Sequence, residues 1–567
     1  MNLMEDWKAV WGNKLYRWML GLTAVCSYGF FVTHQTVGID DTPYAYYFEE
    51  GLNVIVGRWL LFLCNKVFRI SDFSPFLTDL AGVLIFMGGV TVWCALLHSI
   101  CKDRIPMWGY TFFSCIFLSS PLIAEVYPYY LHNGISVGYL CTGVSLCFFR
   151  KLTEQKGTWK EAAATGLGTS LFLVAALGCY ESFMIVWLLG VFLVLLTKHY
   201  MEIRTKVIAS LAKGALAAVA AMILRSVIIA LLIAVFGLGH MREEAVARSV
   251  SQMAGWLFQP GAWAEMAMAI KRVYVMYGVF ALAYLPVRMF VIAVGVILLC
   301  GLYDTIRRKN VCILLLTFGG LFTPFLLVAV EGKATLYRAA QFLPVVCGYG
   351  AFLASYAVVR LGQGKPGGIF SEKEADGRGR ALWDKFTKVL RRGLIFALCV
   401  VLWNQCFDMN QWFYVDWMKY QSAVNLAGQI AYELEGRYDI SKPIVFTGAY
   451  QAPRGIIEDA YVGYQTDTFY QMKRLTDSLD EHLLDKFYRE YGVWVAQTPA
   501  LSVVDWGINA FGSDEELIRF FAMHGYEFVA NTDAERFETA LQISIDWPEF
   551  PKAGSVKDMG EYIIVHF

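Results

Sequence analysis

Long apolar runs separated by short polar segments occupy most of the first 407 residues. A helix needs about 20 mainly apolar residues to cross the hydrocarbon core of a bilayer. The pattern therefore predicts an α-helical polytopic membrane protein with about eleven transmembrane helices. The predicted spans are 15–36, 80–100, 106–123, 133–149, 161–178, 181–197, 207–237, 287–303, 311–329, 342–360 and 391–407.

Basic residues gather in alternate connections between these runs. Short loops rich in lysine and arginine stay on the cytoplasmic side of a membrane. We therefore expect a cytoplasmic N-terminus, with segments 37–79, 124–132, 240–286 and 331–341 facing outward. In the first of these, the apolar periodicity of 52–68 indicates a helix along the membrane surface. The basic connections contain Lys102 and Arg104, Arg150 to Lys160, Lys198 to Lys206, Arg307 to Lys309, and Arg360 to Arg392.

The pattern changes after residue 407, where polar residues alternate with short apolar stretches. This texture predicts a small C-terminal α/β domain outside the cytoplasm, so that a transmembrane domain of 1–407 precedes a tail domain of 408–567. Strands are predicted at 442–448, 526–530 and 562–567, and helices are predicted from Ser513 and over 532–541.

Composition supports a membrane protein and excludes several other classes. Of the 567 residues, 57% are hydrophobic and 17% are charged, and the formal net charge is zero. Mean hydropathy is +0.47. Membrane lipid is therefore an expected partner, whereas nucleic acid is not, because no basic stripe is present. The chain has no Walker-type phosphate loop. Its 13 cysteines lack zinc spacing and are typical of small buried hydrophobic residues, with no disulfide framework indicated.

Two adjacent carboxylates, Asp40 and Asp41, follow the first predicted span, and Pro43 opposes a simple continuation of the helix. A membrane enzyme would place a general base at this position, where water and lipid headgroups meet. The alternative is that the acidic pair only complements a helix dipole.

Other outward polar residues suit the binding of a phosphorylated lipid. Arginine and lysine hold phosphate, arginine with bidentate geometry. The alternatives are structural: Arg58 beside Trp59 could extend to the interface, and the tyrosines could form an aromatic belt. The candidate phosphate-binding residues are Arg58, Arg338 and Lys333, and the candidate substrate-binding residues are Tyr44, Glu125, Tyr129, Tyr130, His132 and Glu181.

Four stretches together resemble the bacterial membrane glycosyltransferases of the GT-C type, and specifically the O-antigen glucosyltransferase II-like family. They are Gly38 to Asp41, Gly57 to Leu61, Tyr337 to Gln341, and Asp546 to Ser555. The pairing of the Asp-Asp stretch with the Gly-Arg stretch is the most specific of these signals. The tail of about 160 residues is longer than the resemblance implies, so the acceptor stays open.

The resemblance implies an inverting transfer of a sugar, with glucose expected, from a polyprenyl-phosphate donor to a cell-surface glycan outside the cytoplasmic membrane. Asp40 or Asp41 would be the catalytic base, with Asp40 favoured, and Arg58 and Arg338 would neutralise the leaving phosphate. Asp40, Asp41 and Glu125 are a candidate oxygen site for Mg²⁺ or Mn²⁺, but their spacing does not require one, so we expect no obligatory metal. A donor-lipid flippase is a candidate partner.

Two rival functions share much of this pattern. A lipid-linked glycan transporter or flippase also has many spans and charged residues near the membrane. However, the two halves of the chain show no matched pair of spans interrupted by glycine or proline. A glycan polymerase or ligase uses similar donors, and the sequence separates it poorly from a glycosyltransferase.

Overall fold

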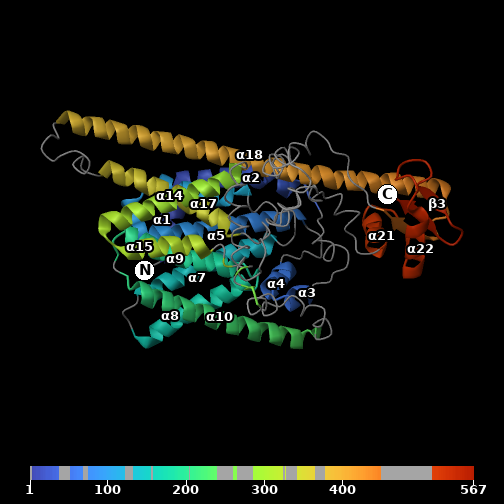
Figure 1. Ribbon diagram of the computed structural model, residues 1–567, viewed down its shortest axis with the longest axis horizontal. Helices are drawn as coiled ribbons and strands as arrows, with labels where there is room; N and C mark the ends of the chain where they lie inside the picture. Colours follow the sequence, from blue (N-terminus) through green and yellow to red (C-terminus); the bar gives the residue numbers. More distant parts are fainter. Residues whose placement is uncertain are drawn as a thin grey trace.

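The computed structural model is a bundle of long helices joined by one very long helix to a small α/β tail (Figure 1). The structure describes residues 3–36, 51–67, 75–121, 132–154, 158–203, 205–238, 260–262, 264, 285–323, 326, 341–363, 377–448 and 514–567.

In the described residues of the bundle, all regular secondary structure is helical. Their bounds are α1 Leu3–Gly12, α2 Lys14–Thr33, α3 Gly51–Ile55, α4 Trp59–Val67, α5 Pro75–Cys101, α6 Met107–Leu118, α7 His132–Glu154, α8 Trp159–Leu177, α9 Phe183–Tyr200, α10 Val207–Val235, α14 Leu285–Arg308, α15 Val311–Phe322, α17 Phe342–Gln363 and α18 Gly377–Arg437, with a short 3-10 helix at Lys102–Arg104.

Each predicted span coincides with a helix, but not each helix is long and apolar enough to cross a membrane by itself. Within the described residues six helices meet both criteria: α5, α7, α9, α10, α14 and α17. Helices α6 and α15 are apolar but shorter. The molecule is therefore a mostly helical membrane protein, and the count of about eleven crossings stays a prediction.

Close helix contacts and aromatic side chains build the bundle core. Helix α7 lies against α5 and α9, and a Cβ atom at Gly138 of α7 would overlap the Phe183 ring. Tyr139 and Trp187 are fully buried, and the Tyr139 hydroxyl donates a hydrogen bond to the Gln341 carbonyl at 2.7 Å. In contrast, α10 exposes Leu216, with 72% of its surface accessible, as expected of a lipid-facing helix.

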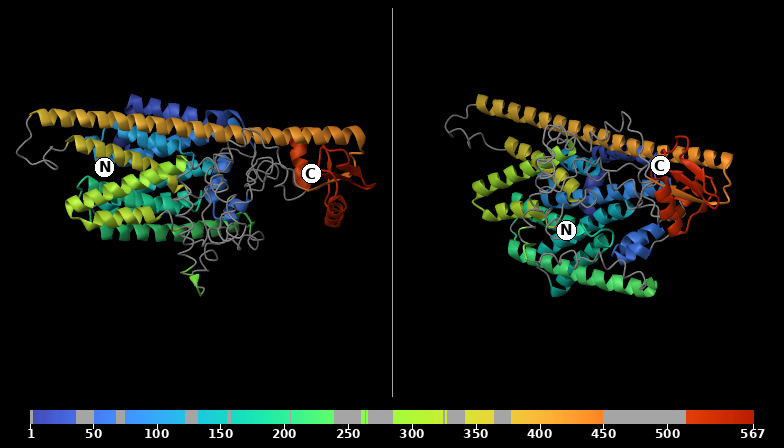
Figure 2. Two further views of the ribbon diagram at one scale, coloured as in Figure 1. Left: turned by 45° about the horizontal axis from the view of Figure 1, so that its top comes forward. Right: turned by 45° about the vertical axis from the view of Figure 1, so that its right-hand side comes forward.

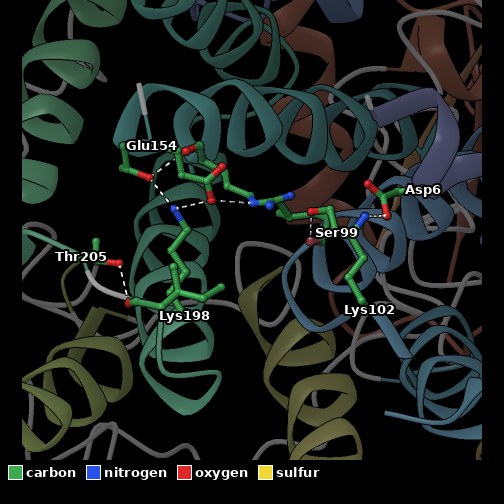
Figure 3. Close-up of polar contacts among 10 residues, drawn as sticks. Asp6, Ser99, Lys102, Glu154, Lys198 and Thr205 are labelled. Carbon is green, nitrogen blue, oxygen red and sulfur yellow. Dashed lines mark hydrogen bonds and ion pairs between the residues drawn. The ribbon is translucent and has the colours of Figure 1, made fainter. Parts of the chain in front are cut away.

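Ion pairs fix the end of the bundle that the basic residues predict to be cytoplasmic (Figure 3). Asp6 of α1 contacts Lys102 at 2.6 Å. Glu154, at the end of α7, contacts Lys198 of α9 at 2.9 Å. Asp304 of α14 contacts Arg360 of α17 at 2.5 Å. Helix termini far apart in the sequence are therefore held together by charge at this end.

The opposite end of the bundle carries α3, α4 and the C-terminal tail (Figures 1 and 2). Helix α18 has 61 residues and runs along the bundle before it reaches the tail. It packs against α2, and the Asn410 side chain donates a hydrogen bond to the Cys26 carbonyl. The predicted boundary at residue 407 therefore falls within a continuous helix, because no proline or helix-ending glycine follows it there.

The tail contains a four-stranded sheet in the order β2-β1-β4-β3. Strands β2 and β4 are parallel to β1, whereas β3 is antiparallel to β4. The small C-terminal α/β region is thus confirmed; the predicted second strand is shorter than expected and β3 was not predicted. The bounds are β1 Pro443–Thr447, α21 Asp514–Met523, β2 Val529–Ala530, α22 Ala534–Ser544, β3 Val556–Asp558 and β4 Ile563–His566.

Candidate functional site

The candidate site begins where α4 docks on the turn between α8 and α9. The backbone N–H groups of Leu60 and Leu61 both donate to the Gly178 carbonyl, at 2.7 and 3.1 Å. A Cβ atom at Gly178 would lie 2.5 Å from the Trp59 indole. Glycine is therefore required for the close approach of this turn to the start of α4.

A sharp turn at Gly57 separates α3 from α4, so the predicted surface helix over 52–68 is broken. Gly57 has a φ angle of +88°, a conformation that side chains other than glycine rarely adopt. The turn is closed by a hydrogen bond from the Arg58 N–H to the Asn53 carbonyl at 2.7 Å. It places Arg58 directly before the first residue of α4.

Arg58, Glu181 and Arg225 form an ionic cluster, which we call the Arg–Glu–Arg cluster. The Arg58 Nε atom lies 3.5 Å from Glu181 Oε2, and the Arg225 Nη2 atom lies 2.9 Å from Glu181 Oε1. Arg225 also donates to the Gly57 carbonyl at 3.3 Å. The three side chains together carry one more positive than negative charge.

The cluster is partly shielded from water. The side chains of Arg58, Glu181 and Arg225 are 26%, 31% and 11% exposed. The Arg58 guanidinium lies over the Tyr180 ring, 4.1 Å from its centroid, in a cation–π contact. The buried Arg225 Nε has no hydrogen-bond partner among the described residues. A buried donor of this kind favours an additional acceptor.

A third segment among those predicted to face outward reaches the same place. The side chain of Ser182, next to Glu181, donates a hydrogen bond to the Gln341 side chain. Gln341 is buried and directly precedes α17. It is also the last residue of the stretch from Tyr337 that carried the family resemblance. The start of α4, the turn between α8 and α9, and Gln341 at the end of segment 331–341 therefore meet.

Two of the predicted site residues, Arg58 and Glu181, are thus brought into contact. Arg58 pairs with Glu181 in the structure, and its assignment as a phosphate-binding residue stays a prediction. His132 is the first residue of α7. The remaining predicted site residues lie outside the described residues: Asp40, Asp41, Tyr44, Glu125, Tyr129, Tyr130, Lys333 and Arg338.

Arg225 was not identified in the sequence, although a signal was present. It is a single arginine in the 29 residues of α10, which is otherwise almost entirely apolar. A charged residue inside a membrane-spanning helix is costly and usually serves a function. Its partner Glu181 lies 44 residues away, and the sequence pattern gave no reason to pair the two.

Within the described part of the chain, no group of three or more histidine, cysteine, aspartate or glutamate side chains is arranged to hold a metal ion. The candidate oxygen ligands Asp40, Asp41 and Glu125 lie outside that part. The described geometry instead favours recognition of an anion, because two guanidinium groups share one carboxylate in a partly buried environment.

Comparison with known proteins agrees with the resemblance seen in the sequence. No curated protein and no solved structure matches the chain. A family model described as Glucosyl transferase GtrII matches residues 29–355, more than half of the 567 residues. The matched region contains the whole Arg–Glu–Arg cluster and Gln341. The chain therefore belongs to the Glucosyl transferase GtrII family, whose members are glycosyltransferases.

Proposed function

We propose that this membrane protein is an inverting glycosyltransferase that moves glucose from a polyprenyl-phosphate donor to a cell-surface glycan, on the outer face of the bacterial cytoplasmic membrane. The observation that carries the proposal is the Arg–Glu–Arg cluster, which lies at the end of the bundle opposite the basic ion-pair network. By the positive-inside rule, that end is extracytoplasmic.

The cluster supplies a site for the donor phosphate. Its excess positive charge suits a phosphate group. Arg338 and Lys333 belong to the segment that ends at Gln341, beside Ser182, and they complete the phosphate-binding group. Stabilising the departing phosphate in a water-poor site contributes about 3 kcal/mol for a well-placed donor.

The chemical step is a single displacement at the anomeric carbon. The Asp40 carboxylate takes the proton from an acceptor hydroxyl, whose oxygen forms the new glycosidic bond. The bond between the anomeric carbon and the phosphate oxygen breaks, and polyprenyl phosphate leaves with the bonding electron pair. Attack from the opposite face inverts the configuration. Asp41 orients Arg58 or the sugar in this proposal.

Other predicted residues bind the substrates in this proposal. Tyr44, Tyr129 and Tyr130 offer apolar faces to the sugar and the lipid, and Glu125, His132 and Glu181 offer polar contacts. Mg²⁺ or Mn²⁺ would be held by Asp40, Asp41 and Glu125 if activity requires a metal. A flippase that delivers the donor lipid to the outer face is the proposed partner.

The test is sugar transfer from synthetic polyprenyl-phosphate-glucose by the purified protein in detergent, with surface glycan as the acceptor. Wild type is compared with Asp40→Asn and Asp41→Asn, and with Asp384→Asn, which removes an exposed carboxylate on α18. We expect Asp40→Asn to lose about 100-fold or more in rate, as a general base typically contributes, while Asp384→Asn keeps full activity. Adding a chelator in parallel tests the metal.

The product and the donor range decide between the remaining functions. The anomeric configuration of the product, opposite to that of the donor, would establish inversion. If wild type consumes none of several lipid-linked sugars, the transferase proposal fails. Movement of labelled lipid from one leaflet to the other in proteoliposomes containing the protein would then favour a flippase. Growth of a glycan from preassembled units would favour a polymerase or ligase.

A further inference from the structure

Two cysteines meet at the contact between α4 and the turn that precedes α9. Cys64 lies on α4, and Cys179 directly follows Gly178 in the turn. Their thiols lie close enough to interact electrostatically. Both side chains are buried, Cys64 at 7% exposure and Cys179 at 1%. All 13 cysteines are free thiols in the structure, so Cys64 and Cys179 are both in their reduced form there.

The backbone holds these two positions together independently of the thiols. Leu60 and Leu61 donate to the Gly178 carbonyl, which fixes the first turn of α4 against the residue before Cys179. Cys64 lies three residues beyond Leu61 and therefore one helical turn along the same face. Two cysteines can be bridged only when their backbones approach to about 6 Å. The hydrogen bonds to Gly178 hold the start of α4 against the residue next to Cys179, and Cys64 follows one turn later.

The position of the pair links it to the Arg–Glu–Arg cluster. Arg58 precedes α4, and Glu181 follows Cys179 by two residues. A covalent bond between Cys64 and Cys179 would therefore join the two segments that supply Arg58 and Glu181. The ion pair alone is partly exposed, and exposed ion pairs add little stability. A cross-link would hold the phosphate-binding group in position more firmly.

We propose that Cys64 and Cys179 form a disulfide bond in the protein at the cell surface, and that this bond holds the Arg–Glu–Arg cluster in its binding geometry. The inference rests on the proposed function for the outward placement of this end. The oxidant is the active-site disulfide of a thiol oxidoreductase. One sulfur–sulfur bond forms here as one breaks in the oxidant, whose two sulfurs take up the two electrons and two protons that the cysteines release.

Cys141 of α7 provides the matched control. It is buried and close enough to Cys64 for the two thiols to interact electrostatically. Unlike Cys179, it lies within a helix and not in a turn that is hydrogen-bonded to α4. The proposal therefore predicts a bond from Cys64 to Cys179 and none from Cys64 to Cys141.

The test is peptide mapping by mass spectrometry. Full-length protein is taken from cells lysed in N-ethylmaleimide without reductant, and the membranes are digested under non-reducing conditions. We expect a cross-linked peptide pair that contains Cys64 and Cys179, lacks the mass of two hydrogen atoms, and separates on reduction. Recovery of both cysteines only as alkylated thiols, or of Cys64 joined to Cys141, overturns the proposal.

A second measurement tests what the bond does. Reduction with dithiothreitol should lower the binding of the phosphate donor by wild type and by Cys141→Ser. The Cys64→Ser variant should bind the donor more weakly than wild type before reduction, and reduction should not change its binding. Binding of a non-transferable polyprenyl-phosphate analogue is the readout. Equal binding before and after reduction of wild type contradicts the proposed role. Peptide mapping needs no sugar transfer, so a failed transfer assay and an absent disulfide are distinguishable results.

Discussion

Glu181 is the residue on which the candidate site depends most directly. It is the acceptor for both Arg58 and Arg225, which come from separate elements. A carboxylate shared by two guanidinium groups organises both, and removing one partner of a mostly buried pair leaves the other without its counter-charge. The arrangement explains why a single arginine is tolerated in the apolar helix α10.

We expect Glu181→Gln and Arg225→Gln each to lower the melting temperature Tm of the detergent-solubilised protein, with a cost of about 2 kcal/mol for a lost charge-assisted hydrogen bond. The double variant should lose less than the sum of the single losses, because both remove the same pair. Differential scanning fluorimetry gives the three values.

The control for this cycle is the ion pair of Arg437 and Glu433 on α18. It joins the same two side-chain types, but the Arg437 side chain is 70% exposed. Removing that pair should change Tm little, since exposed pairs on a helix contribute at most about 0.5 kcal/mol. Strictly additive losses for Glu181 and Arg225 would mean that the two side chains are not coupled.

The turn at Gly57 sets the position of both α3 and α4. Its positive φ angle reverses the chain, and its carbonyl accepts a hydrogen bond from Arg225. A Cβ atom at this position would overlap the Arg225 guanidinium. The turn therefore combines a backbone requirement with a packing requirement.

Gly57→Ala should lower Tm and reduce sugar transfer more than Gly261→Ala does. Gly261 has the same φ angle, +88°, but a Cβ atom there would meet none of the described residues within 4 Å. Both variants incur the cost of a left-handed alanine, about 1–2 kcal/mol, and only Gly57→Ala also displaces Arg225. Comparable losses in the two variants would show that the contact with Arg225 has no influence.

The sequence predicted where helices and strands occur better than it predicted how they connect and pack. Each of the eleven apolar runs overlaps a helix of the described residues, because a lipid-facing or buried helix needs a long apolar stretch whatever its neighbours are. The continuity of α18 past residue 407 was not predicted, since the polar composition of its second half indicated a separate domain. Strand β3, with three residues, is too short to leave a pattern of its own.

The same contrast applies to the candidate site. Arg58 and Glu181 were identified because charged residues at the ends of spans are costly. Their mutual contact, and the role of Arg225, depend on how α4 and α10 pack, which hydropathy does not record. Asp40 and Asp41 lie outside the described residues, so their assignment as catalytic residues stays a prediction.

The whole molecule consists of a bundle and a tail, each with its own hydrophobic core. In the tail, His566 of β4 is 8% exposed and hydrogen-bonded through Nδ1 to the Thr447 hydroxyl at 3.0 Å. Burial lowers the pKa of His566, and the Glu549 carboxylate opposes this only in part. The folded tail therefore holds this histidine in its neutral form to a lower pH than the unfolded chain does.

Acid should accordingly destabilise the tail. Below the unfolded histidine pKa of about 6.5, the unfolded chain binds a proton that the folded tail does not, so stability falls as pH decreases. Hydrogen exchange of peptides from β1 and β4, corrected for the intrinsic effect of pH, should show less protection at a pH of about 5.5 than at about 7.5. His566→Gln should remove most of this difference, and an undiminished difference in the variant would assign the effect to another group.

Helix α18 has a mechanical consequence. Its 61 residues correspond to a rod of about 90 Å, roughly three times the thickness of the hydrocarbon core of a bilayer. Contacts with α2 and α17 hold the rod along the bundle, and the tail is attached at its far end. Beyond its contact with His34 at Trp417, the rod continues for 20 residues to Arg437, about 30 Å, so a tilt of about 5° at the bundle would move that end by about 3 Å. The rod thus transmits small shifts among the helices of the bundle directly to the tail.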